Sequence, residues 1–334
     1  MEKARLHYID VAKGILILMV VYGHIYGVSK GANIDDVSVE WIHQSVNLFV
    51  SFYMPCFFVI TGFCSNFKKP FLTELVQSFK TIVLPGVFFT AILAVKHLNY
   101  ESILGFVKSV VHHGGAYWFL SSLFLARILY WLVFNKIEKK NIQNGVCIVA
   151  FVVGFIISRM YEGPQPWYFI HTLLLTPFLH IGQMLKKIEL KQVKYIAILF
   201  GIALLSTITL SHIGFLEIEY FYHVPGISFK LLNLNLSMLI PFVLLSISGC
   251  LFCFGMSKKI NSNWVLEYLG KNSLVIYCSH TFVMSLLLRQ ICVWGGQLPI
   301  LLKIILAYLL TIIICCVVAY ILNLKYFRVL LGKF

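Results

Sequence analysis

Charged residues are scarce in this sequence: they make up 12% of its 334 residues, whereas hydrophobic residues make up 60%. The sequence also has no stretch between its long apolar runs that is long enough for a separate folded domain. These absences exclude a soluble chain of two domains, which the length alone would allow. The composition instead predicts an all-α polytopic integral membrane protein, with one transmembrane domain over residues 1–334.

Acidic residues are rarer still, with 13 against 27 Lys and Arg, so the formal net charge is +14. No basic face with interleaved aromatic residues occurs outside the apolar runs, so we expect no nucleic-acid partner. The 9 cysteines lie almost entirely inside apolar runs, and the CxxC spacing of Cys250 and Cys253 has no second pair. We therefore expect no metal site and interpret the cysteines as small hydrophobic residues.

Long apolar segments are what the sequence has in abundance. Segments of membrane-spanning length, about 17 to 25 residues, lie at 8–28, 46–66, 81–97, 117–135, 145–160, 167–185, 194–211, 233–256, 273–291 and 299–323. Basic residues concentrate in every second connection, which the positive-inside rule assigns to the cytoplasm. The sequence thus predicts a bundle of about ten transmembrane helices in a bacterial cell membrane, with both termini cytoplasmic. The first segment lacks a small-x-small cleavage site, so we expect it to stay as a helix.

Several of these segments contain polar side chains. A polar or charged group at membrane depth costs several kcal/mol unless it is paired or wet, so each one is a functional hypothesis. The candidates are His24, Arg127, His171, His180, Asn235 and His280, with Asp10 and Lys13 at the inner boundary. Two further histidines, His112 and His113, fall in a connection ahead of Trp118, where we expect a solvated loop.

The opening segment places two of these groups on one face. Lys13 and His24 are eleven residues apart, which in a helix means about 16 Å along the axis and about 20° of rotation. His280 is expected at a similar depth, so the two imidazoles are candidates to converge. Asp10 lies three residues before Lys13, and the alternative interpretation of these two is a boundary ion pair that positions the helix.

Five ordered motifs resemble the acyltransferase 3 family of membrane enzymes. The opening IDVAKGILILMVVYGH is similar to the family's basic residue, ten residues and His, here Lys13 and His24. Many members carry Arg at the first place, and the Lys resembles the fucose 4-O-acetylase-like branch of sugar O-acetyltransferases. Four further stretches resemble family motifs: FYMPCFFVITGF, FKTIVLPGVFF, YWFLSSLF and YLGKNSLVIYCSH.

This resemblance implies an enzyme that moves an acetyl group from acetyl-CoA to a hydroxyl of a cell-surface carbohydrate or lipid-linked glycan. His24 is then the general base, or alternatively a transient acyl carrier. Lys13, with Asp10 and Lys271, lies at the coenzyme A phosphates. The other roles follow as hypotheses: His280 orients His24 or the acceptor or polarises the thioester, and substrate contacts come from Arg127, Trp118 and Asn235.

Two other functions stay open at this point. Proline-broken helices with intramembrane charges also suit a transporter or flippase for a glycan or lipid-linked intermediate. A haem-binding protein would need His24 and His280 facing each other as axial ligands. Besides the acyl donor and acceptor, the expected partners are membrane lipids, and small residues along the segments are compatible with a homodimer.

Overall fold

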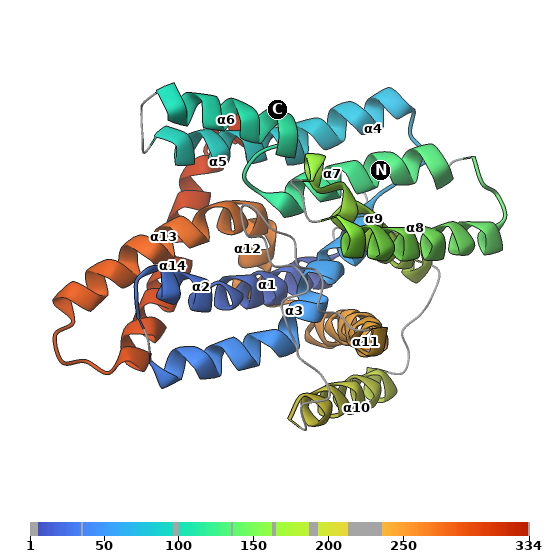
Figure 1. Ribbon diagram of the computed structural model, residues 1–334. Coiled ribbons are helices and arrows are strands. Elements are labelled where there is room, and N and C mark those ends of the chain that lie inside the picture. Colours follow the sequence, from blue (N-terminus) through green and yellow to red (C-terminus); the bar gives the residue numbers. More distant parts are fainter. Residues whose placement is uncertain are drawn as a thin grey trace. The chain divides into compact units, whose positions relative to one another are not determined.

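The computed structural model describes residues 6–34, 36–95, 100–134, 136–161, 165–186, 193–212 and 236–332. Over these residues the chain forms helices and no strands, so the all-α prediction is confirmed (Figure 1). The helices are α1 (His7–Gly23), α2 (Ile25–Gly31), α3 (Val37–Cys64), α4 (Phe71–Ser78), η1 (Phe79–Val83), α5 (Leu84–Val95), α6 (Tyr100–His113), α7 (Trp118–Phe134), α8 (Lys140–Met160), η2 (Pro166–Tyr168), α9 (Phe169–Leu185), α10 (Val193–His212), α11 (Leu236–Ile260), α12 (Trp264–Lys271), α13 (Ser273–Trp294), α14 (Ile300–Leu322) and η3 (Arg328–Leu331).

Each predicted span overlaps at least one of these helices. Among the described residues, 7 helical stretches are long and apolar enough to cross a membrane. They are His7–Gly31, Phe71–Ala94, Ile103–Phe134, Lys140–Ser158, Val243–Ile260, Ser273–Trp294 and Ile300–Leu322. The count of ten spans, the cytoplasmic termini and the single transmembrane domain stay predictions.

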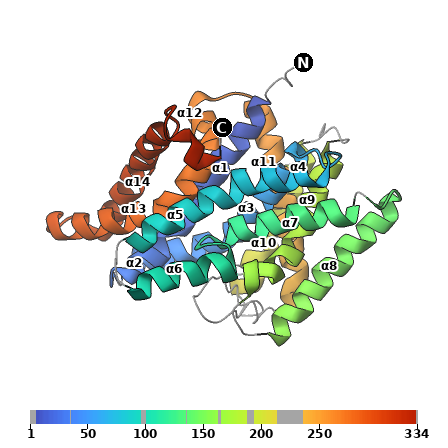
Figure 2. The same ribbon diagram turned by 90° about the horizontal axis from the view of Figure 1, so that it is seen from above.

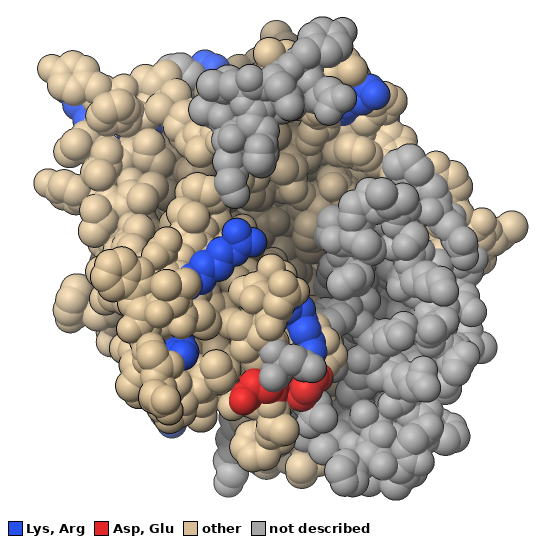
Figure 3. All heavy atoms as spheres, turned by 60° about the vertical axis from the view of Figure 1, so that its left-hand side comes forward, with Lys and Arg blue, Asp and Glu red and all other residues tan. Residues whose placement is uncertain are grey.

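The surface has the character expected of a chain in contact with lipid. On α14, Leu309, Ile313 and Val317 are exposed at four-residue spacing and form an apolar stripe. On the face drawn in Figure 3, charged side chains are few and scattered among uncharged ones. A stripe of this kind would be a liability in water but is stable against acyl chains.

The sequence analysis missed the helix ahead of Trp118. The connection in which we expected a loop is largely α6, and His112 and His113 form its last turn. The expectation of a loop is therefore wrong for both residues. His112 is exposed as expected, whereas His113 Nδ1 lies 3.1 Å from the carbonyl oxygen of Gln165. After α6, Gly114 and Gly115 adopt φ angles of 72° and 115°, which turn the chain into α7.

The described residues fall into two compact units. The first holds α1, α2, α3 as far as Phe57, and α10 to α14 as far as Ile321. Within it α1 contacts α11, α12 and α13, and α2 contacts α13 (Figure 2). The second unit holds α3 from Phe58, α4 to α9, and the chain from Leu322.

A close crossing of α1 and α12 organises the first unit. A Cβ at Gly14 would overlap the carbonyl group of Leu266, and a Cβ at Gly270 would overlap that of Asp10. Only glycine at both positions lets the two backbones approach this closely. The start of α12 is fixed by Asn263, whose side chain accepts a hydrogen bond from the backbone N–H of Leu266 at 3.0 Å.

The close crossing of α1 and α12 can be tested by comparing the stability of two glycine-to-alanine variants. Gly14→Ala forces α1 and α12 apart and is expected to destabilise the protein by about 1 to 3 kcal/mol, the cost of overpacking. Gly201→Ala on α10 is the control, because a Cβ there has nothing within 4 Å and Ala favours the helix by about 0.5 to 1 kcal/mol. Thermal unfolding in detergent measures both. Equal melting temperatures for the two variants would contradict the crossing.

Candidate active site

His24 lies at the junction between α1 and α2. Its backbone stays near the right-handed helical region, at φ −89° and ψ −5°, and its N–H bonds to the Val21 carbonyl at 3.3 Å. The side-chain Nδ1 lies 2.9 Å from the Val20 carbonyl oxygen. A carbonyl oxygen only accepts hydrogen bonds, so Nδ1 carries the proton and Nε2 of the neutral ring carries a lone pair.

His280, on α13, lies against His24. The two ring centroids are 4.7 Å apart and the rings meet edge to face at 77°. His280 Nδ1 is 3.0 Å from the Ile276 carbonyl, which assigns it the same tautomer as His24. Its Nε2 is buried and has no hydrogen-bond partner within the described part of the chain. The structure thus brings together the two imidazoles that the sequence placed at similar depth.

This contact argues against the haem hypothesis. Axial ligation needs a flat macrocycle between two imidazoles, with both coordinating nitrogens aimed at the iron. Rings in direct edge-to-face contact leave no space between them for such a group.

Two tyrosines that contact the last turns of α1 or lie in them were not predicted from the sequence. The Tyr22 hydroxyl lies 2.6 Å from Ser45 Oγ on α3, and the Tyr308 hydroxyl donates to the Leu18 carbonyl at 3.2 Å. Their rings meet edge to face with centroids 6.4 Å apart. These contacts hold the last turn of α1 between α3 and α14. No motif signals them, since tyrosine is common among the aromatic residues of membrane helices.

A cavity opens beside His24 on the side away from Lys13. It has a volume of about 270 Å³ and is lined by His24, Gly27, Val28, Gly31, Ser285 and Arg289. The last two come from α13, five and nine residues after His280. Arg289 was not among the candidates predicted from the sequence.

Charged groups gather at the other end of α1. Lys13 Nζ is 3.7 Å from Asp10 Oδ1, so the predicted boundary ion pair is present. Lys271 Nζ is 3.1 Å from Glu267 Oε2, and His7 Nδ1 is 2.8 Å from the same oxygen. Because α12 crosses α1 at the two glycines, Lys271 and Lys13 belong to one charged cluster at this end.

Glu267 is the central acid of this cluster. The Ser262 hydroxyl donates to its Oε1 at 2.6 Å, and His7 and Lys271 bind Oε2. These hydrogen bonds, with that of Ser262 first, lower the pKa of the Glu267 carboxyl to about 2. The carboxylate is therefore ionised across the physiological range and keeps α12 tied to the start of α1.

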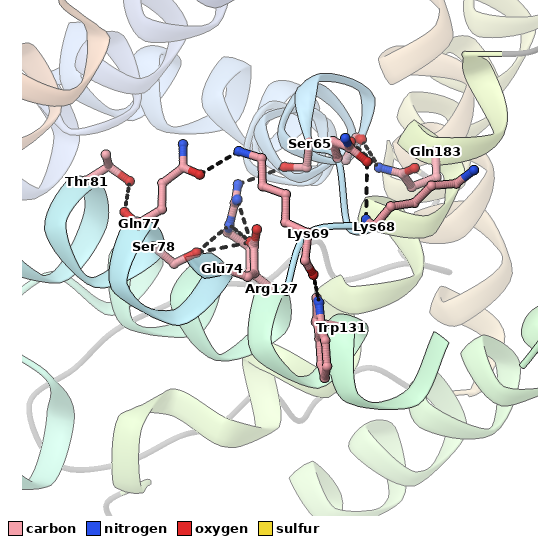
Figure 4. A network of polar contacts seen from close by, with 12 residues as sticks. Ser65, Lys68, Lys69, Glu74, Gln77, Ser78, Thr81, Arg127, Trp131 and Gln183 are labelled. Carbon is pink, nitrogen blue, oxygen red and sulfur yellow. Dashed lines mark hydrogen bonds and ion pairs between the residues drawn. The ribbon is translucent and has the colours of Figure 1, made fainter. Parts of the chain in front are cut away.

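Arg127 belongs to the second unit, where it forms a buried clasp (Figure 4). Its Nη2 donates to Glu74 Oε1 at 2.6 Å, its Nε donates to Ser78 Oγ at 2.9 Å, and its Nη1 donates to Ser65 Oγ at 2.8 Å. The Glu74 carboxylate thus pairs with the guanidinium, as expected for a charged side chain within an apolar segment. These contacts favour a structural role for Arg127, and its substrate role stays a prediction.

The remaining two candidates fare differently. The Trp118 ring lies 5.0 Å from that of His171, which is fully buried in the second unit. Asn235 lies outside the described residues, so its prediction has no structural counterpart.

Removal of Arg127 is expected to unfold the second unit readily. Arg127→Met leaves the buried Glu74 carboxylate without its partner, which costs about 3 to 5 kcal/mol. Replacing both residues by Met removes the uncompensated charge and should restore most of that loss. Chemical unfolding in detergent compares the two. If the double variant were no more stable than Arg127→Met, the loss of stability would not come from the unpaired Glu74 carboxylate.

Glu267 makes a prediction about pH. Because its pKa is lowered on folding, its contribution to stability is fully present above about pH 4.5 and is lost as the pH falls toward 2. The difference in melting temperature between wild type and Glu267→Gln should therefore shrink as the pH is lowered from 6 to 3. A difference that stays constant over this range would refute the clustered arrangement.

The sequence is similar to a known protein family and to two characterised relatives. A family model described as an acyltransferase domain matches residues 6–320. The nodulation protein NolL of Mesorhizobium japonicum is 26% identical over 185 residues, 50% of this chain and 47% of that protein. NolL of Sinorhizobium fredii is 24% identical over 156 residues, 43% of this chain and 41% of that protein. These matches thus span less than half the length of either relative, and no solved structure matches.

The family match covers nearly the whole chain, including both imidazoles, the charged cluster and the cavity. Together with the long apolar helices, it identifies the protein as a membrane protein of the acyltransferase 3 family.

Proposed function

We propose that the protein is an O-acetyltransferase that moves an acetyl group from acetyl-CoA to a hydroxyl of a cell-surface carbohydrate or lipid-linked glycan. The observation that carries this proposal is the state of His24: its Nδ1–H is held by Val20, and its Nε2 has no hydrogen-bond partner among the described residues. A fixed, unprotonated ring nitrogen beside a cavity is what general-base catalysis requires.

The reaction then needs one base in two steps. His24 Nε2 takes the proton of the acceptor hydroxyl as its oxygen attacks the thioester carbonyl carbon. The tetrahedral intermediate collapses with cleavage of the carbon–sulfur bond, and the imidazolium returns its proton to the leaving thiolate. The hydrogen bond to Val20 holds the ring in the required orientation throughout. The alternative of an acetyl group carried on Nε2 uses the same lone pair.

The charged cluster supports the placement of the donor. Lys13 and Lys271 supply two cations at the end of α1, and their side chains remain about a third exposed. Asp10 and Glu267 orient them. From Lys13 to His24 the helix rises about 16 Å, comparable in length to the pantetheine arm of coenzyme A. We infer that the phosphates bind these lysines and that the thioester extends to His24.

The tautomer of His280 favours some of its possible roles over others. With Nδ1–H bound to Ile276, the buried Nε2 accepts a hydrogen bond rather than donating one. Polarising the thioester carbonyl would need a donor, so the geometry favours orienting His24 or an O–H of the acceptor. We further infer, from Lys13, that the chain falls in the fucose 4-O-acetylase-like branch. The apolar segments and the alternation of basic connections support ten spans in a bacterial cell membrane with cytoplasmic termini.

Kinetics of purified variants with labelled acetyl-CoA and candidate glycans test these roles separately. His24→Ala should lower kcat by about 10²- to 10⁴-fold, the usual worth of a general base. Lys13→Ala should chiefly raise the KM for acetyl-CoA by roughly tenfold, since a charge-assisted hydrogen bond is worth about 1.5 to 3 kcal/mol.

Two matched variants serve as controls for these losses. His43→Gln and Lys259→Ala change a histidine and a lysine of the first unit outside the proposed machinery, and both should retain wild-type kinetics. If His24→Ala and Lys13→Ala both lowered kcat and raised the KM for acetyl-CoA to the same extent, with folding intact, this division of roles would be contradicted. Movement of glycan across the membrane without any loss of thioester would instead support a transporter.

A further inference from the structure

Two glycines form part of the wall of the cavity beside His24. Gly27 and Gly31 lie one helical turn apart on α2, and a Cβ built on either one would have nothing within 4 Å. This contrasts with Gly14 and Gly270, where glycine permits helix packing. The two cavity glycines therefore leave space rather than allow contact. The volume of the cavity is about 270 Å³. This is just below the range of about 300 to 1,000 Å³ that is typical of sites for drug-sized ligands, and it suits a sugar unit.

Arg289 gives this cavity a charge. It is the one Lys, Arg, Asp or Glu in α13, and it has no hydrogen bond or ion pair within the described part of the chain. Ser285 Oγ, one turn earlier on the same helix, has no hydrogen-bond partner there either. An unpaired guanidinium near the end of a membrane helix keeps its charge and its five donors available for a ligand.

No acidic side chain among the described residues pairs with Arg289. Glu40, at the start of α3, pairs instead with Lys30 of α2 at 2.9 Å. The cavity lining therefore combines Arg289, a cation without an ion-pair partner among the described residues, with His24, whose Nε2 is unprotonated.

We propose that this cavity is the acceptor site and that Arg289 binds an anionic group, a carboxylate or a phosphate, carried by the acceptor. This inference rests on the proposed function and names the substrate class. Nine residues of helix separate His280 from Arg289, about 14 Å along the axis, and the Arg side chain spans part of that length. The anionic group then lies on the sugar that carries the reacting hydroxyl or on the adjoining one. The donor reaches His24 from the Lys13 end and the acceptor from the Arg289 end.

Acceptor pairs that differ in one charge test this directly. A uronic-acid oligosaccharide is compared with its carboxyl-reduced form, and a phosphorylated glycan with its dephosphorylated form, so that the two arms distinguish carboxylate from phosphate. Wild type should prefer the anionic member of one pair by at least about tenfold in kcat/KM, the value of one charge-assisted hydrogen bond.

Arg289→Gln should abolish that preference while the KM for acetyl-CoA stays unchanged. Lys30→Gln, the matched loss of a paired cation outside the cavity lining, should leave the preference intact. Equal effects of Arg289→Gln on both members of every pair would overturn the proposal.

Filling the cavity is a second, independent test. Gly27→Leu should raise the acceptor KM at least about tenfold with the melting temperature preserved, because the new side chain grows into open space. Gly201→Leu, at an equally open glycine on α10, controls for the helix substitution. Unchanged acceptor KM in Gly27→Leu would exclude the cavity as the acceptor site.

A readout that needs no turnover separates this proposal from the proposed function. Ser285→Cys in a Cys292→Ser background is labelled with an anionic and a cationic methanethiosulfonate of similar size, and the parent without Ser285→Cys gives the background. The anionic reagent should react roughly fivefold faster, as one nearby charge implies. Arg289→Gln should equalise the rates, and glucuronate or glucose phosphate, but not glucose, should slow labelling.

Equal rates for the two reagents in the presence of Arg289 would refute the anion site even if acetyl transfer is observed. Charge-selective labelling without any acetyl transfer would support the anion site and refute the proposed function.

Discussion

The hydrogen bond between His24 Nδ1 and the Val20 carbonyl is the contact on which the account depends. It uses a carbonyl of the preceding turn to fix both the tautomer and the orientation of the ring. The break between α1 and α2 at this residue presents the side chain to the cavity while the helical path continues. His280, held in the same way by Ile276, packs against it. The proposed base is thus positioned by two backbone hydrogen bonds and a ring contact, and it has no carboxylate partner within the described part of the chain.

The arrangement around this pair follows from the two ends of α1. At one end, Gly14 and Gly270 let α12 approach closely enough for Lys271 to join Lys13. At the other, glycines leave a cavity that Arg289 shares with His24. Glycine therefore serves opposite purposes on one path, as a packing contact and as open space. Under the proposed function, the anionic head of the donor and an anionic acceptor would be kept apart by the length of one helix, which suits a reaction between two negatively charged substrates.

Much of this could be predicted from the sequence, because helical periodicity is local. The spacing of Lys13 and His24 fixes their shared face, and the depth of His280 makes it a candidate partner. What escaped prediction depends on packing between distant segments. Nothing local indicates that Gly14 meets Leu266, that Arg127 pairs with Glu74, or that Arg289 shares a cavity with His24. The helix α6 was missed because its short amphipathic sequence falls below membrane-spanning length and was interpreted as a connection.

A structure with bound coenzyme A tests the central claim most directly. The account predicts phosphates at Lys13 and Lys271 and a thiol near His24, with an acceptor hydroxyl in the cavity within about 3 Å of Nε2. Coenzyme A bound elsewhere, or His24 facing lipid with Nε2 away from the thiol, would contradict it.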